Sequence, residues 1–219
     1  MVRFFVTAGE LSGETLTLTG ENAQHAKVLR LKANEQILVC DGEGREALCR
    51  IQQTGGWELS VEEIQESESE ASVQVRVYLA FPKADKLEHV IQKATELGAY
   101  EIIAFPSARC VSKPDEKSLQ KKLERWQKIA ASAAEQSGRG YIPKVIALES
   151  YREALIRGAQ TDLPILFYEN ERATTLRMAL ETGAYQSVSI LTGPEGGFEP
   201  LEVQQAVDYG LSVCTLGKR

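Results

Sequence analysis

Two different patterns of hydrophobic and polar positions divide the chain. From residue 3 to about residue 61 the sequence consists of short β-like runs, namely RFFV, TLTLT, QILVC, EALCRI and WELSV. Turn signals such as DGEG at 41–44 and the pair Gly55-Gly56 separate them. Many short strands at this spacing are typical of a small barrel or sandwich. One short helix, from about Asn22 to Arg30, is expected to interrupt them.

An acidic, serine-rich stretch follows, with the sequence EEIQESESEAS at 62–72. It contains few apolar residues, so it is interpreted as a solvated linker or loop. We place the domain boundary there and predict an N-terminal domain over 1–72 and a second domain over 73–219.

From Val73 onward the pattern changes to strands alternating with helices. Strands are predicted for VQVRVYLAF, EIIAFPS, KVIAL, PILFYE, SVSILTG and LSVCTLG, and helices for residues 85–98, 116–137, 151–158, 173–182 and 200–209. This alternation is typical of a largely parallel sheet covered by helices. Ligands of such sheets bind beyond the carboxyl ends of the strands.

The first helix of this half has the clearest signals. Asp85 is a natural N-cap with Glu88 three residues later, and Gly98 is a natural stop. Helical spacing places one apolar face on Leu87, Val90, Ile91, Ala94 and Leu97. In the long helix over 116–137, the apolar stripe is Leu119, Leu123, Trp126, Ile129, Ala130 and Ala133.

Composition excludes several classes of protein. The chain has 219 residues, 25 Lys+Arg against 31 Asp+Glu, and a net charge of −6, so a general nucleic-acid coat is disfavoured. Residues 109–144 nevertheless hold 9 basic and 4 acidic side chains, a local patch for an anionic partner. No stretch reaches the ~18 apolar residues of a membrane span. Four scattered cysteines and two distant histidines predict no metal site and a reduced, cytoplasmic protein.

The most informative segment is SILTGPEGGF at 189–198, where an apolar strand runs into three glycines and a proline. Glycines let the backbone approach a ligand closely. A helix then starts at Pro200, a residue that suits the first helical position. The loop matches neither a Walker A motif nor GxGxxG. A tight strand-to-helix turn without a ligand explains the same pattern.

Several charged side chains are weaker candidates. Arg139 lies between two glycines after a helix end, where it reaches an anionic substrate or merely satisfies the helix C-terminus. Lys27 and Arg30 share a face of the short helix and hold phosphates or offset nearby acids. Lys83 and Lys86 follow a strand and bind a partner or lie on a solvated surface.

Taken together, these segments resemble one family. RFFV, HAKVLRLK (25–32), KADKLEHVIQKATELG (83–98), AAEQSGRGYIP (133–143), LFYEN (166–170), LTGPEGGFEPLE (191–202) and LGKR (216–219) occur in the order seen in RsmE-type methyltransferases. The resemblance spans essentially the whole chain. It implies S-adenosylmethionine-dependent methylation of N3 of a specific uridine in 16S (small-subunit) ribosomal RNA.

The resemblance also implies an architecture. The fold class is α/β plus a small β-barrel: an N-terminal PUA-like barrel and a C-terminal SPOUT domain with a trefoil knot and a mostly parallel sheet. It further implies a homodimer with the cofactor pocket near the subunit interface. Family members continue past LGKR, so the C-terminal tail is expected to be missing from a chain that ends at Arg219.

Site residues follow by carry-over from the family. The resemblance places Arg139 near the target base and Arg3, Lys27 and Arg30 on RNA, to which the pattern adds Lys83 and Lys86. The expected cofactor-binding residues are Leu166, Phe167, Tyr168, Glu169, Leu191, Thr192, Gly193, Pro194, Glu195, Gly196, Gly197, Thr215, Leu216 and Gly217.

The expected chemistry needs alignment more than covalent help, because the sulfonium is already activated. Arg139 is the candidate for stabilising a uracilate, and Glu135 is a weaker candidate for the general base. Two alternatives stay open. One is a non-catalytic RNA-binding module whose glycine loop is only structural, and the other is a nucleotide-phosphate site at the helix that starts at Pro200.

Overall fold

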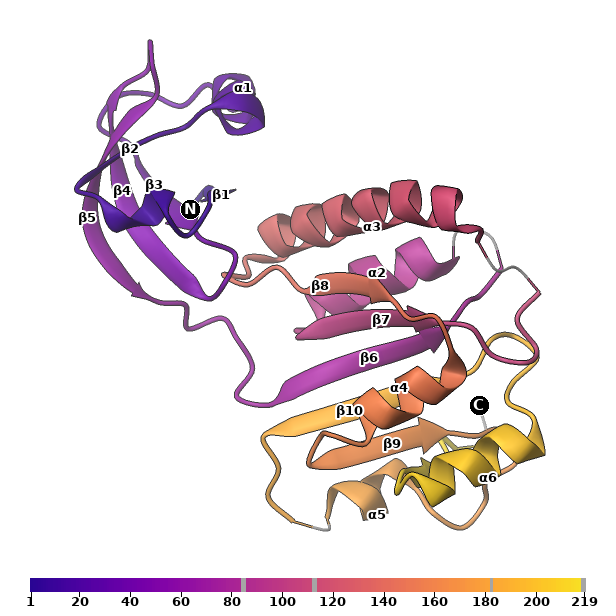
Figure 1. Cartoon of the computed structure of the whole chain (residues 1–219). Coiled ribbons are helices and arrows are strands. Elements are labelled where there is room, and N and C mark those ends of the chain that lie inside the picture. The colour runs from indigo at the N-terminus through magenta and orange to yellow at the C-terminus, as the bar shows by residue number, and fades with distance from the viewer. Residues whose placement is uncertain (84–85, 112–113, 182, 218–219) are drawn as a thin grey trace. The chain divides into compact units, whose positions relative to one another are not determined.

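The computed structural model describes residues 1–83, 86–111, 114–181 and 183–217 (Figure 1). The chain forms two compact units. Residues 1–70 and 134–142 make up the first unit, and residues 71–133 and 143–219 make up the second. The segment 134–142 therefore belongs with the N-terminal sheet, although it lies deep in the second half of the sequence.

The first unit is built on one five-stranded sheet with the order β1-β3-β4-β5-β2. Its elements are β1 (Arg3–Phe5), a 3-10 turn (Glu10–Ser12), β2 (Thr15–Thr17), α1 (Gly20–Val28), β3 (Gln36–Cys40), β4 (Arg45–Gln53) and β5 (Glu58–Glu66). The β1–β3 pair is parallel and the other pairs are antiparallel. In β4 the alternating residues Ala47, Cys49 and Ile51 are buried, as period-two patterning requires, and they pack with Phe4 and Leu59.

The acidic stretch after residue 61 differs from its prediction. Residues 62–66 were expected in a linker, but β5 continues through them to Glu66, which pairs with Arg45 of β4. The reason is cross-strand pairing: acidic side chains point outward from a strand whose backbone completes the ladder with β4. Residues 67–70 then lead out of the first unit.

The second unit holds a six-stranded sheet with the order β11-β9-β10-β6-β7-β8, in which every pair is parallel. Its strands are β6 (Gln74–Ala80), β7 (Glu101–Phe105), β8 (Lys144–Ala147), β9 (Leu163–Phe167), β10 (Ser187–Thr192) and β11 (Ser212–Cys214). Its helices are α2 (Lys86–Glu96), α3 (Glu116–Ser137), α4 (Tyr151–Gly158), α5 (Leu176–Leu180) and α6 (Pro200–Asp208). The residues of α3 after Ala133 count with the first unit.

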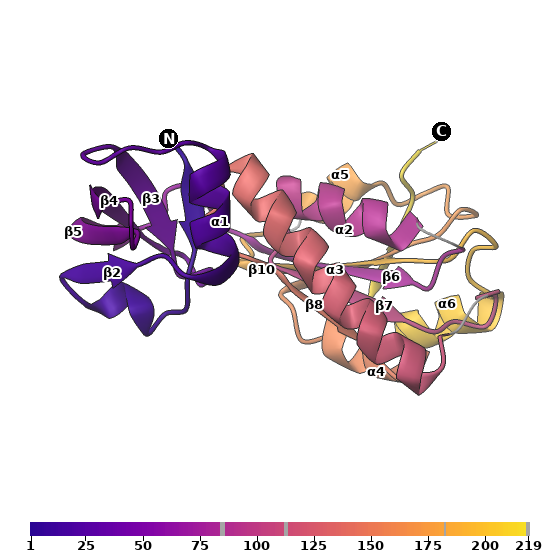
Figure 2. The same ribbon diagram turned by 90° about the horizontal axis from the view of Figure 1, so that it is seen from above.

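Both faces of this sheet are covered, which explains its near-continuous apolar strands. Leu166 packs with residues of α4 and α6 on one face, whereas its neighbour Ile165 packs with α5 on the other. In Figure 2, α2 and α5 lie on one side of the sheet and α4 and α6 on the opposite side. An ion pair between Arg125 and Glu88, 2.7 Å from Nη2 to Oε2, ties α3 to α2.

Helix ends agree with their sequence signals in most places. Gly98 and Gly138 adopt φ values of +93° and +76°, the left-handed conformation that ends a helix. Leu97 was expected on the apolar face of α2 but is 87% exposed, because it follows the last helical residue, Glu96. The helix expected over 173–182 is shorter, since Thr175 caps α5 by accepting the Met178 N–H. The predicted N-cap Asp85 lies outside the described residues.

Candidate functional site

The predicted cofactor loops leave three neighbouring strands at the same edge of the second unit's sheet. β9 lies between β11 and β10, and all three are parallel. Leu191 pairs with Leu166, and Cys214 pairs with Phe167, so the strands end at nearly the same level. Segments separated by almost fifty residues in sequence therefore begin their loops side by side.

Burial separates the roles of the predicted cofactor residues. Leu166 and Leu191 are fully buried core side chains, so only their backbone groups are available to a ligand. Phe167 and Tyr168 are half-buried and pack on opposite faces of the sheet. Glu169 is exposed, so its carboxylate is accessible to solvent just after the end of β9.

The glycine loop after β10 is shaped by a left-handed backbone and by close contacts at two of its glycines. Gly197 has φ +68°, and its N–H donates to the carbonyl of Pro194 at 2.9 Å. A Cβ on Gly197 would overlap the carboxylate of Glu169. A Cβ on Gly193 would lie 3.1 Å from the backbone of Gly197. The loop thus folds tightly on itself and against the loop that follows β9.

Glu195 fastens the glycine loop to the segment after β6. Its carboxylate accepts the backbone N–H of Lys83 at 3.1 Å and pairs with the ammonium of Lys86 at 2.9 Å. The hydrogen bond from Lys86 is the main cause that lowers the pKa of Glu195 to about 2. Lys83 and Lys86 were expected on RNA, and here they contact Glu195 in the predicted cofactor loop. Their RNA role stays a prediction.

Arg109 contacts the predicted cofactor loop, and the sequence analysis did not include it. Its Nη1 donates to the carbonyl of Gly196 at 2.8 Å, and its Nε lies 3.9 Å from a carboxylate oxygen of Glu199. Arg109 follows the buried strand β7, and the carboxyl ends of parallel strands are where ligand contacts gather. Applying that rule to every predicted strand would have found it.

The loop after β11 completes the group. The N–H of Thr215 donates to the carbonyl of Thr174 at 2.8 Å, which joins this loop to the chain that follows β9. Gly217 has φ +97°, and its N–H donates to the hydroxyl of Thr215 at 3.1 Å. Between them Leu216 is 68% exposed, an apolar side chain held out at the site.

The N-terminus of α6 is occupied by carboxylates. Glu202 is 7% exposed, and it accepts the N–H groups of Glu199 at 2.9 Å and Ala108 at 2.8 Å. A carboxylate in the first turn of a helix repels a phosphate group there by its charge. The alternative of a nucleotide-phosphate site at Pro200 is therefore disfavoured.

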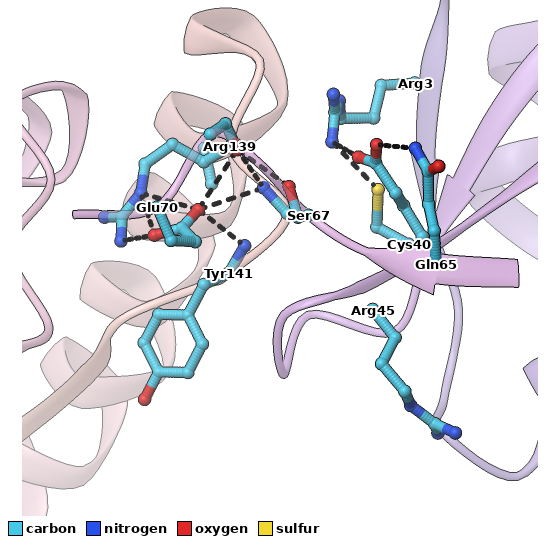
Figure 3. A network of polar contacts seen from close by, with 12 residues as sticks. Arg3, Cys40, Arg45, Gln65, Ser67, Glu70, Arg139 and Tyr141 are labelled. Carbon is cyan, nitrogen blue, oxygen red and sulfur yellow. Dashed lines mark hydrogen bonds and ion pairs between the residues drawn. The ribbon is translucent and has the colours of Figure 1, made fainter. Parts of the chain in front are cut away.

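Arg139 belongs to the first unit, and its side chain is only 5% exposed. Its Nη2 donates to Oε2 of Glu70 at 2.6 Å, and the ring of Tyr141 lies 5.8 Å from the guanidinium carbon (Figure 3). Glu135 lies in the same segment, 3.0 Å from Nδ1 of His25. Neither contact tests the predicted roles of Arg139 and Glu135 toward a base, which stay predictions.

The three basic residues predicted to hold RNA differ in their surroundings. Arg3 is largely buried and donates to Glu46 at 2.7 Å and to the sulfur of Cys40 at 3.2 Å (Figure 3). Lys27 lies in the last turn of α1, whereas Arg30 follows the helix, which ends at Val28, and has φ +56°. The two therefore do not share a helical face as predicted, although both are exposed to solvent. Their RNA contacts stay predictions.

Two kinds of site are absent from the part of the chain that the structure describes. No group of three His, Cys, Asp or Glu side chains there is arranged to hold a metal ion. None of the helices over the described ranges has both the length and the apolar content to span a bilayer.

Comparison with known proteins places both units. Residues 69–219 match the RNA methyltransferase domain family, and residues 18–64 match the RNA methyltransferase PUA domain family. These matches, with the solved structures below, confirm the predicted fold class of a PUA-like β domain and a SPOUT-type α/β domain.

Similar proteins match over nearly the full length. The chain is 36% identical to ribosomal RNA small subunit methyltransferase E of Bacillus subtilis, with 100% of this chain and 90% of that protein covered. A crystal structure of that enzyme from Neisseria gonorrhoeae bound to S-adenosylmethionine is 30% identical, with a TM-score of 0.80 over 100% of this chain and 90% of that one. A complex with the same cofactor from Legionella pneumophila is 27% identical, with a TM-score of 0.84 and the same coverage.

Proposed function

The chain belongs to the family of RsmE-type ribosomal RNA methyltransferases, and from that membership we propose that it methylates N3 of a uridine in 16S ribosomal RNA with S-adenosylmethionine. The observation that carries the proposal is the convergence of three loops at one sheet edge, where Gly197 packs against the carboxylate of Glu169. The chain is an S-adenosylmethionine-dependent ribosomal RNA methyltransferase.

The residues at this edge fit an adenosyl group. Exposed Leu216 offers an apolar surface for a purine ring, and the carboxylate of Glu169 offers acceptors for ribose hydroxyls. The backbone of Leu191 to Gly197 supplies peptide groups that no Cβ covers at its three glycines. S-adenosylmethionine supplies an activated methyl group when it is bound.

The main work of the protein is alignment. The glycine loop is held from two sides, by the Lys86 pair to Glu195 and by the Arg109 hydrogen bond to Gly196. A site held in this way fixes the distance and direction between reacting atoms, and such positioning supplies much of a transfer barrier's reduction.

The acceptor nitrogen needs a different kind of help. N3 of uracil carries a proton and becomes nucleophilic when that proton is lost. Arg139 is proposed to stabilise the uracilate, because a guanidinium favours negative charge on O2 and O4. The proton is proposed to leave to Glu135, to a water that Glu135 holds, or to solvent.

Substrate binding follows from the same chemistry. The N3 edge is used in base pairing, so the target uridine must be unpaired or flipped out. Arg3, Lys27, Arg30, Lys83 and Lys86 are proposed to contact the RNA backbone. Because the net charge is −6, few phosphates are engaged, and we propose the assembled small subunit in the cytoplasm as substrate and a homodimer as the active form.

Two measurements test the proposal. Mass mapping of ribosomal RNA from cells with and without the gene is expected to show the loss of one methyl group at one uridine. Calorimetry is expected to show micromolar binding of S-adenosylmethionine. If the intact chain binds RNA but not S-adenosylmethionine, the alternative of a non-catalytic RNA-binding module is correct.

A further inference from the structure

Glu70 lies in the acidic stretch that the sequence analysis interpreted as a linker, and neither the motifs nor the proposed function uses it. Figure 3 shows its carboxylate inside the turn that carries Arg139. Oxygen Oε2 accepts from Arg139 Nη2 at 2.6 Å and from Nε at 3.2 Å. Oxygen Oε1 accepts the backbone N–H groups of Gly140 at 3.1 Å and Tyr141 at 3.2 Å. One carboxylate therefore holds three consecutive residues.

The turn is built to let this carboxylate in. Gly138 ends α3 with φ +76°, and the N–H of Arg139 donates back to the carbonyl of Ala134 at 2.9 Å. At Gly140 a Cβ would overlap the side chain of Ser67, so only glycine allows residues 67–70 to lie against the turn. The two stretches belong to the same unit although about seventy residues separate them.

Because the side chain of Arg139 is buried, its position depends strongly on the carboxylate of Glu70. The guanidinium side chain is 5% exposed, and a buried guanidinium without a carboxylate partner is strongly destabilised. Contacts through both Nε and Nη2 fix the plane of the guanidinium as well as its place, because its donors form a rigid fork.

We propose that Glu70 is a positioning residue for the methyl transfer: it holds the guanidinium of Arg139 in the geometry that the reaction uses. The proposal rests on the function proposed above for Arg139. Glu70 acts through Arg139 and does not contact the reacting atoms. Its negative charge weakens the field of the guanidinium, so its contribution to the rate is orientation and not electrostatics.

The test is Glu70→Gln in the full-length protein, assayed with labelled S-adenosylmethionine and small ribosomal subunits from cells that lack the gene. Gln keeps the size of the side chain and one acceptor oxygen but loses the charge. We expect kcat to fall about tenfold to a hundredfold, because small misplacements of a catalytic group cost that much. The KM and Kd for S-adenosylmethionine are expected to stay unchanged, which also shows that the second unit is folded.

The matched control is Glu62→Gln. The carboxylate of Glu62 pairs with Arg50 and accepts from the side-chain amide of Gln36, and both partners lie on the N-terminal sheet. Loss of this ion pair is expected to leave kcat unchanged. If Glu62→Gln lowers kcat as much as Glu70→Gln does, the effect belongs to the unit as a whole and the proposal is overturned.

A double variant separates the proposed role of Glu70 from the proposed role of Arg139 on which it rests. With enzyme in excess, Glu70→Gln combined with Arg139→Ala is expected to react no more slowly than Arg139→Ala alone. A slower double variant, or a Glu70→Gln variant with normal or raised kcat, overturns the positioning role. If Arg139→Ala itself keeps the wild-type rate, the proposed role of Arg139 fails, and this single variant shows that result without any change at Glu70.

Discussion

Replacing Gly197 by alanine tests whether the glycine loop needs its observed shape. Gly197 has φ +68°, a conformation that costs a residue with a Cβ about 1–2 kcal/mol. The new Cβ would also overlap the carboxylate of Glu169. Glu169 is exposed and flexible, so its carboxylate swings away at little cost. The backbone conformation therefore sets the magnitude.

This cost lowers either the stability of the protein or its affinity for S-adenosylmethionine. If the rest of the loop holds residue 197 in place, the free energy of unfolding falls by about 1–2 kcal/mol. If the loop relaxes, stability is kept and the affinity for S-adenosylmethionine falls roughly five- to thirtyfold, the equivalent of the same free energy. Chemical denaturation and calorimetry on one protein sample measure both quantities.

Gly183→Ala is the control, because a Cβ there meets no atom within 4 Å and the backbone is not left-handed. It reports the loss of unfolded-state freedom that any Gly→Ala change brings. Adding Glu169→Ala to Gly197→Ala is not expected to restore either quantity. If Gly197→Ala matches Gly183→Ala in both stability and affinity, the loop does not require a left-handed residue and the reasoning is refuted.

Three further predictions follow from charges and thiols. The hydrogen bond from Lys86 is the main cause that lowers the pKa of Glu195 from 4.5 to about 2, so the pair stabilises the fold fully above pH 4.5 and loses that effect as pH falls toward 2. In an acid titration, the free energy of unfolding of Glu195→Gln is therefore expected to fall less steeply than that of the wild type. Burial raises the pKa of Cys40 and of Cys49 to about 11, so at pH 8 about one thiol in a thousand is ionised, and both are expected to resist a thiol reagent until the protein is denatured. Binding to small ribosomal subunits is expected to weaken between about 50 and 200 mM salt, by the modest amount that a few phosphate contacts give, while the affinity for S-adenosylmethionine changes little in the same titration. Equal salt dependence of the two affinities would contradict an RNA contact based on phosphates.

Local periodicity was enough to predict most of the fold. The helix over 116–137 and the helix over 151–158 agree with the structure to the residue, because their apolar spacing and end signals coincide. Strand alternation after residue 73 predicted the parallel sheet. Residues 62–66 were misassigned because composition alone hides a strand whose partner, β4, supplies the pairing.

In the candidate site, too, residues with a local sequence signal were predicted and residues with distant partners were missed. The loop from Leu191 to Gly197 was found from its glycines, whose spacing is a local signal. Arg109 and Glu70 were missed, because their partners, Gly196 and Arg139, lie 87 and 69 residues away in sequence. Long-range partners of this kind leave no periodic trace in the sequence: the strand-end rule could have marked Arg109 as a candidate, but the contact partners of both residues come from the fold.

The membership of residues 134–142 in the first unit limits how the protein can be dissected. A fragment starting at residue 71 carries that segment without the N-terminal sheet, and it keeps the Arg139 cation while losing the Glu70 anion. In such a fragment the segment 134–142 lacks the sheet that it belongs with, so poor expression would say nothing about the methyltransferase half. A chimera that exchanges the N-terminal sheet for a relative's must carry residues 1–70 and 134–142 from the same parent.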